Sequence, residues 1–473
     1  MSRINTNVSS LIAQKNLGRT NEGLQRALTR LSTGLRINDG KDDPAGLIAS
    51  ENLRSDIEGI RRAITNSERA NQLIATADSG LGQVSNLLLD IRGLITEAAN
   101  EGVLSDEQIA ANQLQVDVSL TAINRIAQTT TFQGKKLLDG GLDFIIDSNP
   151  PTIQNVSIYQ ATLDDANQLD LDITINAGAT QALLTVAAAG FPNAGSTLAN
   201  DLVVQIGGVT GTEAFTFQAG ASLEQVIDAI NLVSDATGTT AANNAGVLEL
   251  ASVEYGTDAF VDVRVIEETG GTDFGAELSN FRGTGTDIDA IINGVTASGD
   301  GNRLSVNTST LSLDITVSDG DSTNLAFTID GGGALFQIGP DVVSNQQARL
   351  GIGSINTALL GSEAGRLFEL LSGGNYDLTN DATTASRIIN DTITKIASLR
   401  GRLGAFQRTT LQTNIVTLND TLTSLVEAES TIRDANFAVE TANLTRAQIL
   451  VQSGTQVLSI ANQNPQNVLA LLQ

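Results

Sequence analysis

The sequence contains no histidine, no cysteine and no tryptophan, and only one methionine among its 473 residues. The chain therefore has no imidazole base and no thiol nucleophile, and it lacks the usual ligands of zinc, haem and iron–sulfur sites. Carboxylate chemistry alone stays open. Acidic pairs such as Asp164/Asp165 and Glu267/Glu268 are better explained as solvated turns than as glycosidase or calcium sites. We expect no enzyme activity, no catalytic residue, no metal and no cofactor.

The negative charge is confined to the centre of the chain. Residues 1–140 hold 15 basic and 16 acidic side chains, and residues 375–473 hold 7 and 8. Residues 141–374 hold 5 basic and 29 acidic side chains, so this segment carries −24 of the total charge of −26. Thirty of the 45 glycines fall in the same segment. The composition predicts two nearly neutral arms that flank a different kind of domain.

The charge and hydropathy patterns also exclude several partners. Nucleic acid and anionic membrane surfaces need clustered Lys and Arg, which this acidic chain does not have. No stretch approaches the ~20 apolar residues of a membrane span, and the first residues lack the apolar core of a secretory signal. Taken alone, these patterns indicate the cytoplasm. The lack of cysteine fits a reducing compartment, and it equally fits a chain that must stay easy to unfold.

The N-terminal arm has the pattern of a long helix. Asp43 followed by Pro44 predicts a helix start with Asp43 as the N-cap. A seven-residue repeat follows, broken only by Ser67, with members Leu53, Ile60, Ile74, Leu81, Leu88 and Ile95. A helix of about 57 residues would be roughly 85 Å long, too long to bury its own apolar stripe. Ser105 with Gln108 predicts a capping box that opens a second helix.

The C-terminal arm repeats the heptad signal. Its register contains Leu411, Leu418, Leu425, Ile432 and Val439, and a second register follows with Leu444, Val451 and Leu458. Sustained heptads on both arms predict helices that pack along one another as a coiled coil. A stripe of ordinary globular core is the alternative. The apolar residues of the first 35 and last 30 positions also need a partner, and each end is the nearest candidate for the other. Ends that pair only weakly would stay disordered in a lone subunit and fold on assembly, and a docked terminus is the alternative.

Three segments resemble bacterial flagellins. They are LSTGLRINDGKDDPAGLIASENLRSDIEG (Leu31 to Gly59), TTTFQGKKLLDG (Thr129 to Gly140) and the tail from LRGRLGAFQ at Leu399 to NVLALL at Leu472. The likeness covers about the first 140 and the last 100 residues, in the correct order and at the correct ends. Pro44 and Asn436 are mild departures, because the family more often has Ala and Asp at these positions.

The resemblance implies a structural subunit that is exported unfolded and polymerises into the flagellar filament used for swimming. It changes the expected location from the cytoplasm to the extracellular flagellum. The implied partners are other copies of the chain, the flagellar cap and hook–filament junction proteins, and an export chaperone at the C-terminal segment. A hook–filament junction protein is the alternative function, because such proteins share the plan of the arms; the tail ANQNPQNVLALL favours the filament subunit.

The implied fold class is α+β, with a long antiparallel helical coiled-coil rod formed by both chain ends and a β-rich inserted outer region. The expected inner-tube helical domain comprises residues 1–43 and 431–473. The rod domain comprises 44–143 and 374–430, and the acidic outer region comprises 144–373 as one or two subdomains. We expect self-assembly to depend on apolar heptad positions, although each could equally belong to the core of one subunit: Leu11, Leu28, Leu31, Leu88, Leu411, Leu418, Leu425, Ile432, Leu450 and Leu458.

One implied binding surface is degenerate. Many flagellins are sensed by Toll-like receptor 5 through an R-x-R-E-L type motif on the long helix and a Glu on the next helix. Here Asp90 replaces the first Arg and Gln115 stands at the Glu position, while Arg92 and Leu94 remain. An acidic side chain cannot replace the ionic contact of an arginine, so we expect weakened recognition by this receptor.

The centre changes from seven-fold to two-fold periodicity. Alternating runs predict strands over 247–253, 261–265, 311–317 and 325–329. The segment SLEQVIDAIN predicts one short amphipathic helix between strands, and this unit resembles the insertion motif of flagellins and hook-associated proteins, which is often marked by Ala-Ile-Asn. The similar DAIIN at residues 289–293 is either a second copy or a chance echo.

Overall fold

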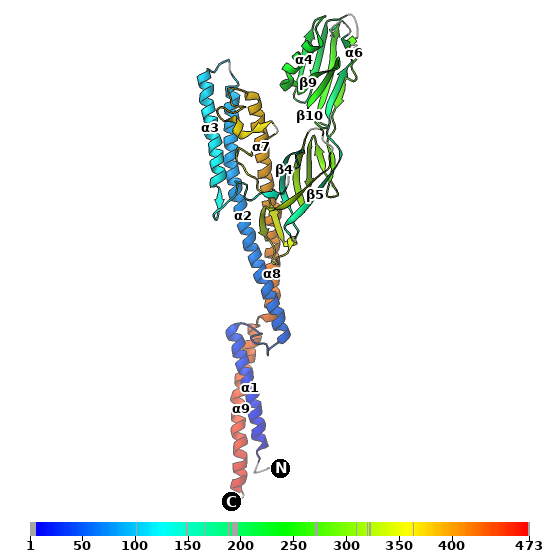
Figure 1. Cartoon of the computed structure of the whole chain (residues 1–473). Helices are drawn as coiled ribbons and strands as arrows, with labels where there is room; N and C mark the ends of the chain where they lie inside the picture. Colours follow the sequence, from blue (N-terminus) through cyan, green and yellow to red (C-terminus); the bar gives the residue numbers. More distant parts are fainter. Residues whose placement is uncertain are drawn as a thin grey trace. The chain divides into compact units, whose positions relative to one another are not determined.

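The computed structural model describes residues 6–100, 102–147, 150–164, 166–187, 190–191, 197–269, 273–308, 310–318, 320, 323–362 and 364–471. The chain divides into two compact units. Unit 1 comprises Met1–Gln72, Gln337–Gln347 and Ala405–Gln473, and unit 2 comprises Leu73–Phe336 and Ala348–Gly404. Helices form both ends of the chain and strands dominate its centre (Figure 1), so the predicted α+β class with helical arms is confirmed.

The long helix of the N-terminal arm begins and continues as its sequence predicts. Helix α2 runs over Pro44–Ala98, and the backbone N–H of Gly46 donates to the Asp43 carboxylate at 2.9 Å. Every heptad position from Ile60 to Ile95 is buried, including Ser67. Helix α3 (Asp106–Thr129) also begins as predicted, because the N–H of Ser105 donates to the Gln108 side chain at 3.0 Å. Local capping and periodicity therefore determine both helices.

The C-terminal arm contains α7 (Ala382–Ala405), the π-helix η4 (Phe406–Gln412), α8 (Thr413–Arg433) and α9 (Phe437–Leu471). Buried Ile389, Ile396 and Leu403 stand seven apart, but the next heptad residue, Leu411, follows Leu403 by eight. A π-helix holds an extra residue in its turn. The η4 segment therefore absorbs the additional residue and restores the heptad register for Leu411 and Leu418.

Unit 1 has a small apolar core where α2 packs on α8. Ile60 and Ala63 of α2 are buried with Leu418 of α8. The segment 337–347, which includes the 3₁₀ turn η2 (Ser344–Gln346), also contacts both helices. The Asn414 side chain donates to the Ile338 carbonyl oxygen at 2.7 Å, and a Cβ on Gly59 would lie 3.0 Å from that of Pro340.

Two β modules, each with its own hydrophobic core, form the centre of the chain within unit 2. Module A, made of segments 144–177 and 288–332, has a sheet in the order β14-β13-β5-β18-β3 and another in the order β15-β16-β17-β4. Its strands are β3 (Phe144–Ile146), β4 (Ile153–Ala161), β5 (Gln168–Ala177), β13 (Asp289–Ile292), β14 (Val295–Thr296), β15 (Ser298–Asp300), β16 (Arg303–Asn307), β17 (Leu311–Val317) and β18 (Leu325–Gly332). Module B is inserted in the sequence between β5 and β13.

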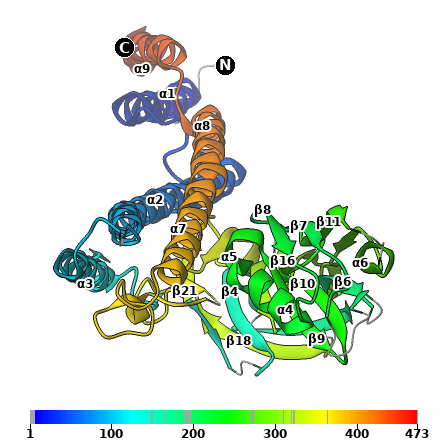
Figure 2. The same cartoon turned by 90° about the horizontal axis from the view of Figure 1, so that it is seen from above.

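Module B, residues 181–284, has one sheet in the order β6-β10-β9 and another in the order β12-β11-β7-β8. Its elements are β6 (Gln181–Val186), β7 (Leu202–Gly207), β8 (Thr212–Phe217), α4 (Leu223–Leu232), α5 (Ser234–Thr237), β9 (Thr239–Asn244), β10 (Val247–Tyr255), β11 (Phe260–Glu268), α6 (Asp273–Ala276) and β12 (Arg282–Thr284). Helix α4 lies against β9 (Figure 2) and buries its apolar face in the module core. The strands predicted over 247–253 and 261–265 here, and over 311–317 and 325–329 in module A, are confirmed.

The Ala-Ile-Asn of residues 229–231 and the DAIIN of residues 289–293 have different structures. Asn231 follows Ile230 in helix α4, and its side chain bonds the backbone of Ala241 in both directions, at 2.9 and 2.8 Å. The DAIIN segment is strand β13 followed by a tight turn in which Asn293 and Gly294 both have positive φ. DAIIN is therefore a chance echo of the helical motif.

Shorter elements connect these parts. They are β1 (Thr131–Phe132), β2 (Lys135–Lys136), β19 (Ala334–Gln337), β20 (Gln347–Leu350), β21 (Gly361–Ser362), β22 (Gly365–Arg366) and the 3₁₀ turn η3 (Leu367–Leu370). The buried side chain of Gln113 on α3 donates to the Leu370 carbonyl oxygen at 2.8 Å and accepts from the N–H of Leu378 at 2.9 Å. This amide thereby holds the segment after η3 on α3.

A nearly buried carboxylate joins module A to the C-terminal arm inside unit 2. Asp314 of β17 accepts from the guanidinium groups of Arg303 and Arg402, the latter at 2.9 Å, and from the Tyr159 hydroxyl at 3.1 Å. The Arg402 guanidinium also lies over the Tyr159 ring, 3.2 Å from its centroid. Burial and the nearby Asp314 charge raise the pKa of Tyr159. Because Arg402 belongs to α7, this cluster fixes the sheet of β17 on that helix.

A second carboxylate, Asp143, directly precedes strand β3 of module A, and its charged form destabilises the folded state. Burial raises the pKa of Asp143, although the N–H of Phe144 donates to it at 2.8 Å and opposes the shift. A raised folded-state pKa gives stability that is complete below the unfolded value of 3.8 and is lost as pH rises through the folded value. At neutral pH the charge therefore weakens the fold.

We expect Asp143→Asn to raise the thermal unfolding temperature at pH 7, because the amide keeps the acceptor for Phe144 and removes the partly buried charge. The advantage should shrink as pH falls and vanish below about 3.8, the unfolded pKa, where wild-type Asp143 is protonated. Calorimetric scans of both proteins across this pH range make the comparison. A variant that melts below wild type at pH 7 would contradict the burial argument.

Candidate assembly surface

Helices α1 (Val8–Thr33) and α9 form an antiparallel pair within unit 1 (Figure 1). At one end the Ser10 hydroxyl bonds the Asn462 side chain at 2.7 Å. At the other end Arg30 forms an ion pair with Glu440 at 3.1 Å, and a short antiparallel bridge joins Leu35 to Asp434. The predicted pairing of the two chain ends is therefore present in the subunit.

The seam between α1 and α9 is built from small side chains. Ser10, Ala13 and Ala27 of α1 are buried, as is Ala461 of α9. A Cβ on Gly454 would lie 3.2 Å from the Leu17 side chain, so the helices approach closely there. Larger seam residues such as Val451 and Leu458 are only half-buried. The pair therefore leaves apolar surface exposed along its length.

Large apolar side chains are exposed on both helices of the pair. They are Val8, Leu11, Ile12 and Leu28 of α1, and Phe437, Val439, Ile449, Leu450, Val457 and Ile460 of α9. At about 100° per residue, Ile449, Leu450, Val457 and Ile460 fall on one side of α9, next to the seam. Contiguous exposed apolar surface marks a protein–protein contact. These side chains are the strongest candidates for contacts between subunits.

The ten predicted packing residues fall into three environments. Leu88, Leu411 and Leu418 are buried inside the subunit. Leu31, Leu425, Ile432 and Leu458 are half-buried. Leu11, Leu28 and Leu450 are exposed, with 58%, 48% and 51% of their surface accessible. The sequence pattern did not distinguish these classes, because heptad periodicity marks an apolar face without saying what covers it.

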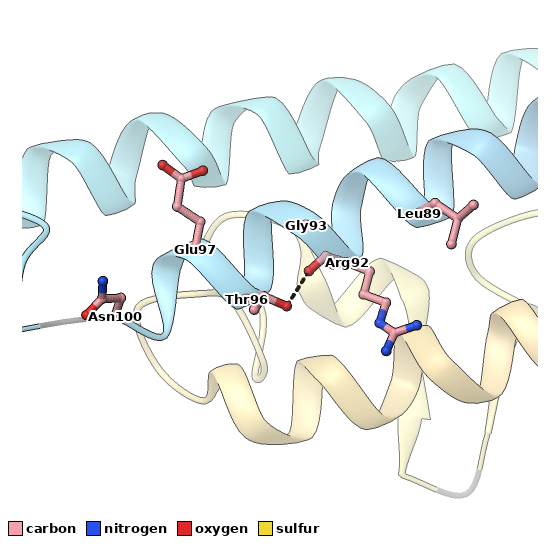
Figure 3. A pocket seen from close by; sticks show the side chains of 6 residues that line it. All are labelled: Leu89, Arg92, Gly93, Thr96, Glu97 and Asn100. Carbon is pink, nitrogen blue, oxygen red and sulfur yellow. Dashed lines mark hydrogen bonds between the residues drawn. The ribbon is translucent and has the colours of Figure 1, made fainter.

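The positions of the degenerate receptor motif lie on α2 and α3. Asp90, Arg92 and Gln115 are exposed, and Leu94 is half-buried. Figure 3 shows the Arg92 side chain extending from α2 beside a shallow depression lined by Leu89, Gly93, Thr96, Glu97 and Asn100. The Thr96 hydroxyl donates to the Arg92 carbonyl oxygen at 2.9 Å. Arg92 is therefore accessible, with an acidic residue in place of the usual basic neighbour.

The acidic pair Glu267/Glu268 was predicted to lie in a solvated turn, and this prediction is wrong. Glu267 and Glu268 lie in strand β11, not in a turn. The Glu268 carboxylate accepts from the N–H groups of Phe274 and Gly275, at 2.8 and 3.3 Å, and so holds the start of α6. Asp165 lies outside the described residues. In the part of the chain that the structure describes, no three acidic side chains are grouped so that they could hold a metal ion.

None of the described helices combines the length and the apolar composition that a membrane span requires.

Three family models match this chain. The bacterial flagellin N-terminal helical region matches residues 4–142, and the bacterial flagellin C-terminal helical region matches residues 386–472. The flagellin hook IN motif matches residues 204–254, which contain the strand–helix–strand unit around α4. The three matches together cover more than half of the chain, and the last confirms the resemblance of this unit to the insertion motif.

Curated relatives align along the whole chain. B-type flagellin of Pseudomonas aeruginosa is 28% identical over 521 aligned residues, and a flagellin of Salmonella typhimurium is 29% identical over 527. Each alignment covers 99% of this chain and 99% of the relative. A solved structure of the Escherichia coli flagellar cap protein FliD is 16% identical and covers 47% of this chain and 63% of that one. Its TM-score of 0.26 supports no conclusion about this chain.

The relatives are named flagellins, which favours the filament subunit over the junction protein. The family models account for both helical arms, and the alignments extend through the β-rich centre. This chain belongs to the bacterial flagellin family and is a structural subunit of the extracellular flagellar filament.

Proposed function

We propose that the apolar side chains left exposed on α1 and α9 hold neighbouring subunits together in the filament. The observation that carries this proposal is the accessibility of Leu11, Leu28 and Leu450 in the free subunit. Burying one such side chain contributes roughly 1.5 to 3 kcal/mol. Half-buried Leu31, Leu425, Ile432 and Leu458 would complete their burial on assembly, while Leu88, Leu411 and Leu418 hold the arms within one subunit.

Replacing Leu450 by Ala tests this assignment. We expect the critical concentration for polymerisation to rise about tenfold, which corresponds to ~1.4 kcal/mol, while the melting of the monomer stays unchanged. Gln448→Ala is the matched control, because Gln448 is exposed on the polar side of the same helix. Sedimentation of polymer at a series of chain concentrations gives the critical concentration of each variant. Equal critical concentrations for the two variants would refute the proposed role of Leu450.

The same proposal assigns the chain segments to layers of the filament. Residues 1–43 and 431–473 form the inner tube, residues 44–143 and 374–430 form the rod, and residues 144–373 face the solvent. The charge distribution supports this arrangement, because each arm is close to neutral and can pack against its copies without strong repulsion. The acidic centre, which carries −24, would repel its copies if it were packed inside the tube.

We further propose that the chain is exported unfolded, with a chaperone bound at its C-terminal segment until export, and that it meets the flagellar cap and the hook–filament junction proteins at the two ends of the filament. The composition supports an unfolded passage, because no disulfide or histidine–metal site has to be broken beforehand. The chain's role is structural, and we propose that it catalyses no reaction.

Recognition by Toll-like receptor 5 is proposed to be weak. We expect Asp90→Arg with Gln115→Glu to raise the potency of the chain in a receptor reporter assay by about tenfold or more, because both changes restore charges that the family uses. Gln108→Glu, which adds an acidic charge at the start of the same helix α3, serves as the control. Full activity of the wild-type chain at low concentration would contradict the proposal.

A further inference from the structure

One face of the four-stranded sheet in module B is open to solvent. Its other face packs in the module core, where Val204, Ile206, Val261 and Val263 are buried. Residues that alternate with these point outward: Arg264 pairs with Gln205, Gln205 pairs with Ala214, and Asp262 pairs with Arg282. Ala214, Arg264 and Arg282 are exposed. We call the outward side that carries these residues the β11 face.

The β11 face is the neutral part of a strongly acidic module. Residues 181–284 contain 13 acidic and two basic side chains. The two basic side chains, Arg264 and Arg282, both lie on the β11 face. The acidic side chains placed there by strand pairing are Asp262 and Glu267, since Glu267 pairs with outward-facing Val203. The charges that strand pairing places on this face therefore balance.

The charges on the β11 face alternate along the strand. Asp262, Arg264 and Glu267 follow one another in β11, in the order negative, positive, negative. Arg282 is partly engaged already, because it lies 4.0 Å from Asp262 and 4.1 Å from the centroid of the Phe260 ring. Within the described part of the chain, Arg264 forms no ion pair. An antiparallel copy centred on Arg264 would place like charges opposite one another. When the two-fold axis lies between Arg264 and Glu267 instead, each Arg264 faces Glu267 of the other copy, and the two rows are complementary.

We propose that the β11 face binds the β11 face of a second copy of this chain, with Arg264 placed against the acidic side chains of the partner's strand. The proposal rests on the filament function, because assembly brings copies of module B to a high effective concentration and lets a weak contact form. The acidic sides of two modules repel each other, whereas the neutral alternating face can meet its copy without net repulsion. The contact links outer modules and adds to the assembly made by α1 and α9.

The absence of cysteine makes a direct test possible in the full chain. A single Gln205→Cys variant places a thiol on the β11 face, and Ala242→Cys places one on exposed β9 of the other sheet. Filaments of each variant are sedimented, treated with a short bis-maleimide reagent and analysed on a denaturing gel. We expect at least five times more covalent dimer from Gln205→Cys than from Ala242→Cys.

Arg264→Glu, added to Gln205→Cys, should reduce the dimer to the level of the Ala242→Cys control while the filaments still sediment. Filaments that sediment but crosslink equally at both positions, or that crosslink fully with Arg264→Glu, would overturn the paired-face proposal and leave the filament function intact. Failure of the single-cysteine chains to sediment would contradict the filament function itself, and with it the contact that depends on assembly.

Discussion

Leu458→Asp is expected to abolish filament growth while the chain is still secreted. Leu458 follows Gly454 by one helical turn, so it lies on the face of α9 that packs on α1 at Leu17. The described seam residues near Leu458, which are Leu17, Gly454 and Ala461, carry no charge. A carboxylate there would be unpaired, and burying it costs several kcal/mol. The pairing of α1 with α9 would then be lost, and with it the apolar surface that the pair offers to the next subunit.

The measurement is the amount of chain in filaments and in the medium of cells that carry the variant. Ser459→Asp is the control, because the neighbouring residue is exposed and adds the same charge on the polar side of α9. We expect normal filaments with Ser459→Asp, and free secreted chain without filaments for Leu458→Asp. A Leu458→Asp strain with filaments of normal length would count against pairing of the chain ends.

Asp314→Ala is expected to destabilise unit 2 by about 2–3 kcal/mol. Removing one partner from a buried ion pair costs about 3–5 kcal/mol, and the cost is lower here because the arginines keep some contact with water. Their side chains retain 50% and 30% of their exposure for Arg303 and Arg402. The Tyr159 hydroxyl also loses its acceptor. The variant should therefore lose the ion pair that joins β17 to α7.

Calorimetry of the monomer measures this loss as a lower unfolding temperature of the affected transition. Asp289→Ala is the charge-matched control, since Asp289 is an exposed acid in the same module. Filament yield should stay close to wild type at low temperature, because α1 and α9 are untouched. A loss below about 0.5 kcal/mol, the usual range of surface substitutions, would show that the Asp314 cluster contributes little.

Much of the helical fold follows from local sequence signals. The start of α2 at Pro44, the capping box at Ser105 and the heptad from Ile60 to Ile95 all have a short-range cause, and the structure has each of them. The alternating strands of the centre and the helix α4 were predicted for the same reason. Period and capping act within a few residues, so one sequence is enough to recognise them.

Other features depend on residues that are far apart in the sequence. The Asp314 cluster joins Tyr159, Arg303 and Arg402, which have no common motif. Module B is inserted in the sequence between β5 and β13 of module A, which are neighbours in one sheet. Periodicity predicts strands, but it does not reveal which strands pair. The π-helix η4 was missed because one register ends at Leu403 and the next begins at Leu411, and each looks regular by itself.

The candidate assembly surface was only partly predictable. The pattern marked Leu11, Leu28 and Leu450 as apolar positions, and it marked buried Leu88 and Leu411 in the same way. The exposure of Leu11, Leu28 and Leu450 follows from the seam of small residues at Ser10, Ala13 and Ala27. This seam brings α1 and α9 together and leaves the larger side chains outside it. Small and polar residues do not score as an apolar face, so hydropathy gave no signal for this seam.

Growth of the purified chain on filament seeds is the most direct test of whether the helical arms support repeated addition of subunits. Short filament fragments are mixed with increasing amounts of full-length chain, and the added length is measured by electron microscopy. If each added subunit exposes the same assembly surface to the next one, the added length should grow in proportion to the amount of chain supplied. A single added layer that then stops, whatever the supply, would contradict a self-propagating subunit.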